Sequence, residues 1–243
     1  MKREFQACTR AFAALALGMT LALASAQAQE NGNGNGNGDN ENGVYDPLEG
    51  FNRAMFAVNE GIDKVALKPA ALAYEAAVPL PARVGVANFY DNLWDVNRSG
   101  NAFLQGKPKK GFTGLARLLI NSTVGIFGLF DVASELELEE GDEDFGQTLA
   151  VWGVPDGPYL FLPFVGPSNP RDLAGWSVDQ ASYPLWTHTD DNPAVRNSLV
   201  VLGSVRARAA LLPADTVIED ASFDKYLYIR SAALQRRAAQ IRD

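Results

Sequence analysis

One stretch of the sequence limits the possible folds more than any other, because it is apolar and yet interrupted by proline. It runs from Gly153 to Gly175 as GVPDGPYLFLPFVGPSNPRDLAG, in which five prolines lie among tyrosine, leucine, phenylalanine and valine. Proline lacks a backbone N–H and disrupts helix interiors, so this segment cannot form one long helix. Loops are normally polar, since buried loop backbone has trouble finding hydrogen-bond partners. The stretch therefore predicts a rigid, partly apolar turn or hairpin in surroundings that tolerate exposed apolar side chains.

Two runs of the chain beyond its N-terminal segment are apolar and carry no charged residue. Residues 118–130 read LLINSTVGIFGLF, and residues 157–169 read GPYLFLPFVGPSN. As helices, runs of this length would reach about 20 Å at 1.5 Å per residue, whereas the hydrocarbon core of a bilayer is about 30 Å thick. Neither run can cross a membrane alone, but both are long enough to enter one leaflet. Composition alone favours the alternative, which is two core segments of a soluble helical domain.

Glycine and proline inside these runs argue against plain core helices. Gly125 and Gly128 lie among isoleucine, leucine and phenylalanine, where each glycine would cost a helix about 1 kcal/mol relative to alanine. Non-helical apolar backbone is tolerated at membrane depth where protein buries it or where it lines a cavity. The pattern therefore favours a cavity or rim that contacts lipid.

The first 44 residues predict export followed by a flexible connection. Residues 1–28 have the form of a Sec signal peptide, with basic residues, an apolar run and A-x-A sites that predict cleavage after Ala26 or Ala28. An uncleaved anchor is the alternative, but the apolar run is shorter than the roughly 20 residues of a spanning helix. Residues 29–44 are rich in asparagine and glycine, which predicts a disordered tether.

Residues 45–243 predict a single, mostly helical domain. Apolar residues from Leu48 to Val65 recur at helical spacing, and Pro69 is expected to interrupt that helix. No run of alternating strands is present, apart from one possible hairpin in the proline-rich stretch. Further helices are expected over residues 70–77, 81–93, 96–104, 110–121, 145–152, 171–181 and 192–212, before a final helix capped by Ser222.

Motifs that carry catalytic chemistry are scarce. His188 is the only histidine, and Cys8, the only cysteine, lies in the predicted signal peptide. A zinc site needs more of these side chains. A Ser-His-Asp triad would have to use His188, and the sequence contains no G-x-S-x-G motif. We therefore expect no catalytic residue, metal or cofactor. A formal net charge of −8 disfavours nucleic acid as a partner. The seven carboxylates between Glu135 and Asp144 are expected to form a solvated acidic loop rather than a metal site.

Long, ordered motifs resemble those of a known family. They are YDPLEGFNRAMFAVNEGID at 45–63, FLQGKP at 103–108, RLLINSTVGIFGLFDVAS at 117–134, FGQTLAVWGVPDGPYLFLPFVGPSNPRD at 145–172 and YPLW at 183–186. Together they closely resemble the MlaA (VacJ) family, and the likeness covers almost all of residues 45–237.

The resemblance implies an outer-membrane protein on the periplasmic side that maintains lipid asymmetry. It implies an all-α, ring-like bundle of short and medium helices with a Pro/Gly-rich apolar loop or hairpin, lying in one membrane leaflet. An amphipathic channel in the ring would let mislocalised phospholipid leave the outer leaflet. The implied partners are phospholipid, an outer-membrane porin trimer and a periplasmic lipid carrier similar to MlaC. Many members carry a lipobox cysteine, and its absence after the apolar run here speaks against an acyl anchor.

The candidate site residues come from the two charge-free runs and their flanks. Five aromatic residues are candidates for lipid contact or for lining the channel, with core packing as the alternative: Phe127, Phe130, Tyr159, Phe161 and Phe164. Three basic residues are candidates for contacts with head groups or a partner, with solvated lysines and an Arg171–Asp172 pair as the alternatives: Lys109, Lys110 and Arg171. Backbone shape is expected to depend on Gly125, Gly128, Gly157, Pro163, Gly166 and Pro167.

Three classes of function compete. A passive phospholipid channel needs no nucleophile and no cofactor, which agrees with the scarcity of catalytic motifs. A soluble periplasmic lipid-binding or chaperone-like module is favoured by the missing lipobox cysteine. An enzyme such as a phospholipase is the third class, and release of fatty acid from phospholipid would identify it. Membrane fractionation with co-purification of a porin separates the first two classes.

Overall fold

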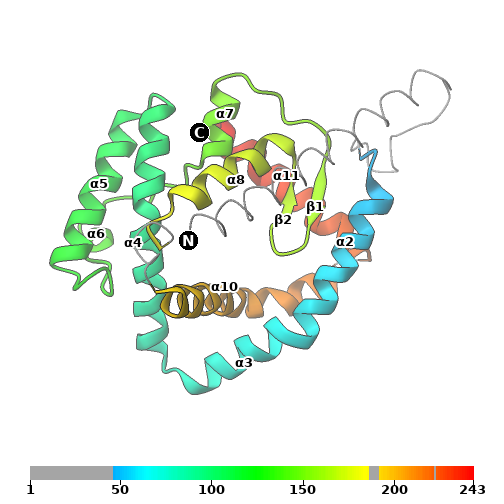
Figure 1. Ribbon diagram of the computed structural model, residues 1–243, viewed down its shortest axis with the longest axis horizontal. Helices are drawn as coiled ribbons and strands as arrows, with labels where there is room; N and C mark the ends of the chain where they lie inside the picture. The colour runs from blue at the N-terminus through cyan, green and yellow to red at the C-terminus, as the bar shows by residue number, and fades with distance from the viewer. Residues whose placement is uncertain (1–45, 186–191, 222) are drawn as a thin grey trace. The chain divides into compact units, whose positions relative to one another are not determined.

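Helices account for most of residues 46–185, 192–221 and 223–243, which the computed structural model describes (Figure 1). The predicted all-α class with one small hairpin is confirmed. The predicted signal peptide and tether lie outside the described residues, as do Trp186, His188 and Ser222. In chain order the elements are α2 (Glu49–Ile62), the π-helix η1 (Asp63–Leu67), α3 (Lys68–Ala77), α4 (Leu80–Leu104), α5 (Pro108–Thr123), α6 (Val132–Glu135), α7 (Phe145–Val151), β1 (Leu160–Leu162), β2 (Gly166–Ser168), α8 (Pro170–Ser182), α10 (Pro193–Ala221) and α11 (Lys225–Arg242).

The first helical segment passes through Pro69 without a break. Since α2, η1 and α3 follow one another directly, the predicted interruption at Pro69 is wrong. Proline cannot donate to the carbonyl four residues earlier, and its ring clashes with that carbonyl. The π-helical turn before it lets the Lys68 N–H bond to the carbonyl of Asp63, five residues back. The wider turn accommodates the proline within a continuous helical path.

α4 is one helix of 25 residues, whereas the sequence predicted two shorter ones. The reason lies in its buried face, which carries Asn92, Asp95, Asn97, Ser99 and Asn101. Prediction from apolar periodicity assumes that the apolar stripe is the buried one. A helix whose buried stripe is polar is therefore divided at its polar positions.

α10 also extends past its expected end at residue 212, through Pro213 to Ala221. Arg208, before the proline, donates from Nη2 to Asp215 at 2.8 Å, and from Nε to Asp63 of η1 at 2.6 Å. These bonds hold α10 on both sides of Pro213. The last helix, α11, begins at a cap from Asp224, whose side chain accepts from the Leu227 N–H, instead of at Ser222.

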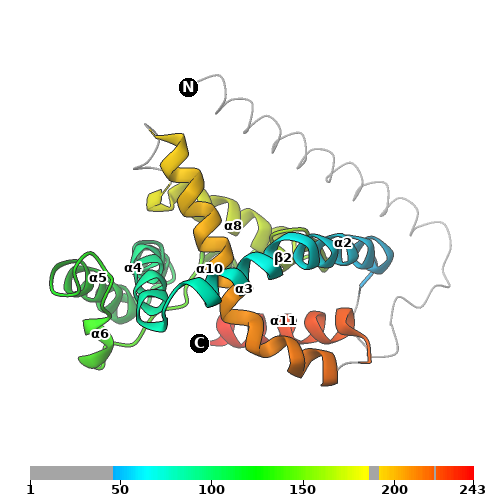
Figure 2. The same cartoon turned by 90° about the horizontal axis from the view of Figure 1, so that it is seen from below.

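The elements pack as neighbouring pairs in residues 47–243. Both views place α4 beside α5 and α10 across α3 (Figure 1, Figure 2). The two strands are antiparallel, with Leu160 opposite Ser168, and β1 packs on α2 while β2 packs on α11. The apolar cores are small: one cluster contains Phe56, Tyr159, Phe161 and Tyr226, and another contains Tyr90, Tyr183 and Leu185.

Polar side chains connect α4, α7 and α8. Asp179 of α8 accepts from Asn101 Nδ2 at 2.9 Å and from the Phe145 N–H at 2.8 Å. Thr148 of α7 donates to Asn101 Oδ1 at 3.0 Å. Burial raises the pKa of Asp179, while the bonds from Phe145 and Asn101 oppose that rise. The junction of these three helices is therefore a hydrogen-bonded polar network.

Candidate functional site

The segment that joins α5 to α6 presents a large apolar surface. We call residues 124–130 the apolar turn. The side chains of Phe127 and Phe130 are 77% and 59% exposed. Large exposed apolar patches mark contacts with lipid, with another protein or with a ligand. The surface of the apolar turn is extended along α5 by Phe112, Leu115 and Leu119.

The backbone of the apolar turn is hydrogen-bonded to the last turn of α5 and to itself. In lipid, an unpaired N–H or C=O group costs several kcal/mol, because no water is present to bond it. The internal bonds allow irregular backbone to enter an apolar phase. These bonds run from Val124 N–H to the Ile120 carbonyl, Phe127 to Ser122, Gly128 to Asn121 and Phe130 to Gly125, at 2.8–3.1 Å.

Left-handed backbone gives the apolar turn its shape. Ile126 and Phe127 have φ of 52° and 56°, a region that costs bulky residues on the order of 1–3 kcal/mol each. Gly128 follows at φ 82°, and a Cβ there would lie 2.7 Å from Asn92 Nδ2. A Cβ at Gly125 would collide with the Phe130 carbonyl oxygen. Both glycine positions therefore exclude a larger residue.

Polar side chains hold the apolar turn from the protein side. Arg117 of α5 is 3% exposed and donates from Nη2 to the two carboxylate oxygens of Asp131, at 3.2 and 3.1 Å. Asn121 donates to Asp131 Oδ1 at 2.9 Å and accepts from the Ala133 N–H at 2.9 Å. Burial opposes ionisation of Asp131, but hydrogen bonds from Ser134 and Asn121 lower its pKa below the usual value. The carboxylate of Asp131 is therefore a charged anchor at the end of the apolar turn.

α4 supplies a second set of supports. Asn88 donates to the Leu129 carbonyl at 3.1 Å, and Asn92 donates to Ser122 Oγ at 3.0 Å. Asp95 is 1% exposed and lies 3.6 Å from Arg117 Nε, between carboxylate oxygen and nitrogen. Burial raises the pKa of Asp95 to about 6, although nearby arginines lower it. Behind the apolar turn, Asp95 is thus a buried carboxyl group whose ionisation is opposed by burial and favoured by nearby arginines.

α4 and α5 have the reverse of the usual helix polarity. A helix of a soluble domain buries its apolar face and exposes its polar one. In α5 the buried residues are Gly111, Gly114, Arg117 and Asn121, whereas the exposed stripe is Phe112, Leu115 and Leu119. In α4 most of the buried residues are polar, with Tyr90 and Ala102 as the exceptions, and Val84, Phe103 and Leu104 are exposed. The outer surface of this pair of helices is therefore largely apolar.

The hairpin of β1 and β2 treats its aromatic residues differently. Tyr159 and Phe161 are 4% and 3% exposed and pack with Phe56 and Tyr226. For Tyr159 and Phe161 the structure favours the core-packing alternative, because residues of α2 and α11 cover both rings. Phe164, at the tip with φ 66°, is 76% exposed. The lipid-contact candidates that remain exposed are Phe127, Phe130 and Phe164.

Two amides of α2 fix the hairpin. Asn52, which is fully buried, donates to the Tyr159 carbonyl at 3.1 Å and accepts from the Phe161 N–H at 2.8 Å. Asn59, two helical turns later, accepts from the Phe164 N–H at 3.1 Å. The sequence analysis did not select either asparagine, because a polar residue inside an amphipathic stripe gives no signal of its partner.

The expected backbone-shaping residues lie before the hairpin, in its turn and in β2. Gly157 and Gly166 lie at φ 76° and 84°, where side chains other than glycine are strained. Pro163 begins the connection between the strands, and Pro167 pairs with Phe161 in the register. A two-stranded sheet has edges on both sides, so Pro167 loses no ladder bond that a central strand would need.

The basic candidates separate into one exposed and two engaged residues. Lys109 is exposed. Lys110 pairs with Glu143 at 2.9 Å and with Asp243; partial burial opposes it, but the bonds to these carboxylates raise the pKa of Lys110. Arg171 is 8% exposed and pairs with Asp172 at 3.0 Å, as the structural alternative proposed. Lys109 is therefore the candidate whose side chain faces outward.

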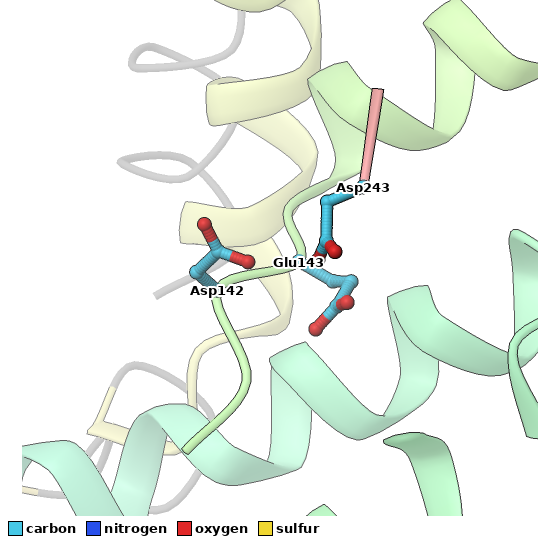
Figure 3. A group of neighbouring side chains, drawn as sticks. All are labelled: Asp142, Glu143 and Asp243. Carbon is cyan, nitrogen blue, oxygen red and sulfur yellow. The ribbon is translucent and has the colours of Figure 1, made fainter. Parts of the chain in front are cut away.

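The acidic loop before α7 is not wholly solvated, contrary to expectation. Glu143 is 3% exposed, and its carboxylate lies near those of Asp142 and Asp243 (Figure 3). Lys107 and Lys110 lie 3.7 and 2.9 Å from Glu143 Oε1 and compensate its charge. Two ammonium groups beside this cluster oppose the binding of a cation.

Arg237 of α11 joins the starts of α7 and α8. It donates to Asp172 Oδ2 at 2.9 Å from Nε and to Asp144 Oδ1 at 2.9 Å from Nη2. Asp144 caps α7, and Asp172 lies in the first turn of α8. Both aspartates could be expected at helix starts, but their common partner lies 93 and 65 residues away in sequence.

A shallow depression lies on α10. Its lining changes along the helix from Asn197 and Ser198 to Val201, Leu202 and Val205, and its volume is about 470 Å³. The lining surface is almost wholly apolar, although Asn197 and Ser198 contribute to it.

Comparison with known proteins gives consistent results. A family model described as "MlaA lipoprotein" matches residues 44–240. An uncharacterized protein of Rickettsia typhi is 38% identical over 207 residues, which covers 83% of this chain and 81% of the relative. The "Intermembrane phospholipid transport system lipoprotein MlaA" of Escherichia coli is 37% identical over 201 residues, which covers 81% of this chain and 78% of the relative.

A solved structure is similar as well. It comes from work on the "Structural basis for maintenance of bacterial outer membrane lipid asymmetry" and superposes with a TM-score of 0.71 at 36% identity. The match covers 82% of this chain and 100% of the solved chain. Sequence and structure comparisons therefore agree over the same part of the molecule.

Proposed function

The chain belongs to the MlaA lipoprotein family, and on this premise we propose that it acts in intermembrane phospholipid transport at the outer membrane. In this proposal it removes mislocalised phospholipid from the outer leaflet through an amphipathic channel. The lipid then passes to a periplasmic carrier, so that the asymmetry of the outer membrane is maintained.

The observation that carries the proposal is the reversed polarity of α4 and α5. The buried residues of α5 are arginine, asparagine and glycine, and those of α4 are mostly asparagine, aspartate and serine beside Tyr90 and Ala102, whereas phenylalanine, leucine and valine are exposed on both helices. Water would penalise such an exterior at roughly 25 cal/mol per Å² of apolar surface. A bilayer leaflet removes that penalty. Among the described residues no helix is long and apolar enough to cross a membrane, which suits residence in one leaflet.

The physical barrier to lipid movement explains what such a protein contributes. Each methylene moved from a membrane into water costs about 0.8 kcal/mol, so extraction of two acyl chains is prohibitive without an apolar wall. A charged head group at the bilayer centre costs several kcal/mol. An amphipathic path lowers both barriers at once. The α10 depression, whose lining is almost wholly apolar, is a candidate section of the apolar wall of that path.

The exposed aromatic residues receive the lipid-contact role. Phe127, Phe130 and Phe164 would contact acyl chains, because all three are exposed on rigid, hydrogen-bonded backbone. Lys109 would contact phosphate groups from the exposed start of α5. Tyr159 and Phe161 would support the hairpin from the core rather than contact lipid.

Direction and partners come from outside the chain in this proposal. A passive path equilibrates lipid and cannot drive it one way, so a periplasmic carrier must remove the product. A porin trimer would provide a protein wall for part of the apolar surface. No reaction chemistry is required of the chain, and we propose that it is not an enzyme.

Deletion of the gene tests the function. We expect more phospholipid in the outer leaflet and greater sensitivity to detergent, both restored by the unaltered chain. Phe127→Ser/Phe130→Ser should restore neither fully, whereas Lys64→Ser, an exposed change on η1, should restore both. Unchanged lipid asymmetry in the deletion strain would contradict the proposal.

Fractionation separates the proposal from a soluble lipid-binding module. The chain should sediment with the outer membrane and co-purify with a porin. Recovery wholly in the periplasm would favour the soluble module. Sustained release of fatty acid from phospholipid by the purified chain would instead indicate a phospholipase.

A further inference from the structure

Arg117 is a buried charged residue at the centre of the support behind the apolar turn. It is 3% exposed and contacts three residues of the stretch after the turn: the anchor residue Asp131, Ser134 of α6 at 3.1 Å from Nη1, and the Leu138 carbonyl. Taking a charge out of water costs several kcal/mol unless partners compensate it. Packing alone does not explain an arginine here, because an apolar residue could fill the space at a lower desolvation free energy.

The geometry of these contacts suits arginine and no other side chain. The guanidinium group is a planar fork with five N–H donors, so one residue can bond a carboxylate, a hydroxyl and a carbonyl together. Lysine presents a compact ammonium on a flexible stem and cannot reproduce that arrangement. The partners of Arg117 lie 14, 17 and 21 residues further along the chain, which is the stretch that follows the apolar turn.

We propose that Arg117 is the positioning residue of the apolar turn, which it holds in its outward-facing conformation through Asp131. The proposal rests on the lipid-contact function proposed above and names the residue that makes the contact surface rigid. Arg117 does not touch lipid itself. It fixes the end of the turn, while Asn121, one helical turn away, bonds the same carboxylate.

The conformation of the turn explains why it needs an anchor. Ile126 and Phe127 have left-handed backbone that is unfavourable for their side-chain types. Such conformations persist only where the surrounding structure over-determines them. Without the bond to Asp131, the segment gains freedom to relax, and Phe127 loses its fixed outward direction. The exposed phenylalanines would then lose preorganisation for lipid rather than lose contacts with the protein core.

A spin label at position 127 measures this directly. Because Cys8 is the only cysteine, the full chain carrying Cys8→Ser and Phe127→Cys takes a single label. We expect a strongly immobilised spectrum in detergent and loss of the immobilised component in Arg117→Met. Arg117→Lys should restore it only in part, because lysine cannot bond Asp131 and Ser134 together. The milder variant Asp131→Asn should give an intermediate spectrum and serves if Arg117→Met does not fold.

Matched controls separate positioning from general stability. A label at Phe164→Cys, on the hairpin tip, should be unaffected by Arg117→Met. Conversely, Arg237→Met removes another double carboxylate contact and should leave the label at position 127 immobilised. An unchanged label at 127 in Arg117→Met and Asp131→Asn, or equal mobilisation at 127 and 164, would overturn the proposal.

The same labels test the lipid-contact function independently. In vesicles of phosphatidylethanolamine and phosphatidylglycerol, oxygen accessibility should place the label at 127 within the hydrocarbon region. A label that is immobilised in detergent but stays in water beside vesicles would support the anchor role of Arg117 and contradict lipid contact. A label that is mobilised by Arg117→Met, and that lies in the hydrocarbon region when Arg117 is unaltered, supports both the anchor role and lipid contact.

Discussion

The apolar turn and the hairpin start from similar sequences and reach opposite environments. Both derive from charge-free runs that are interrupted by glycine or proline. The apolar turn exposes Phe127 and Phe130 and has polar side chains behind it. The hairpin buries Tyr159 and Phe161 against α2 and α11 and exposes Phe164 at its tip.

The difference shows that apolar content does not decide where a segment faces. The polar anchors decide it. Arg117 and Asn121 bond the end of the apolar turn from α5, and Phe127 and Phe130 remain exposed. Asn52 instead bonds the backbone of β1 and brings Phe161 within 5.3 Å of Phe56, between ring centroids. The same residue types serve as surface in one region and as core in the other.

Truncation in the hairpin should give the largest change in stability. Phe161→Ala should lower the free energy of unfolding by about 3–5 kcal/mol, because it removes a buried ring and leaves a cavity. Urea unfolding followed by tryptophan fluorescence measures the change. The matched variant Phe164→Ala, three residues away and exposed, should change it by less than about 0.5 kcal/mol. Similar losses in both variants would refute the burial assigned to this hairpin.

Asp95, behind the apolar turn, should make stability depend on pH. Burial raises its pKa from 3.8 to about 6, so the folded chain holds a proton that the unfolded chain has released between these values. The contribution of this proton to the free energy of unfolding is complete below pH 3.8 and is lost as pH rises through about 6. The free energy of unfolding then falls by about 3 kcal/mol.

The difference between the unaltered chain and Asp95→Asn isolates this effect from other carboxylates. The free energy of unfolding of the unaltered chain, relative to the variant, should fall between pH 4 and pH 7. The comparison matters because Asp131 and Asp172 have lowered pKa values and act in the opposite direction. A difference that stays constant over this range would contradict a raised pKa.

The amide anchor of the hairpin should give a smaller loss. Asn52→Ala leaves the Phe161 N–H and the Tyr159 carbonyl without this partner, at a cost of about 1–3 kcal/mol. Asn59→Ala removes one bond near the exposed tip and should cost less than about 1 kcal/mol. Equal costs, measured by urea unfolding, would mean that Asn52 is not the principal anchor of β1.

Truncation in the apolar turn should have the smallest effect on stability and a clear effect on membrane binding. Phe127→Ala should change the free energy of unfolding by less than about 0.5 kcal/mol. Loss of a phenylalanine from the lipid contact should weaken partitioning into vesicles by roughly tenfold, from about 1.5 kcal/mol of burial. Vesicle flotation measures this, and Phe161→Ala at a temperature where it is folded serves as the comparison. Unaltered flotation would remove Phe127 from the contact surface.

Local chemistry made part of the fold predictable. The prolines and glycines of residues 153–175 predicted the hairpin, since they restrict backbone directly. Asn192-Pro193 predicted the start of α10, and residues 145–152 predicted α7 to within a residue. The exposed aromatic positions 127, 130 and 164 were among the candidates, but their sequence neighbours do not distinguish them from the buried positions 159 and 161.

The sequence by itself determined the helical class, the hairpin, the family motifs and the two segments too short to cross a bilayer, because these follow from neighbouring residues. Only the tertiary structure decided which face of α4 and α5 is buried, which aromatic rings form core, and which carboxylates meet Arg117 and Arg237. Those outcomes depend on partners far apart in the chain, such as Asn52 and Phe161, which are separated by 109 residues. The environment of a side chain is set by the atoms that surround it after folding. When part of the protein surface is apolar, an aromatic residue can lie on that surface or in the core, so its type alone does not determine its position.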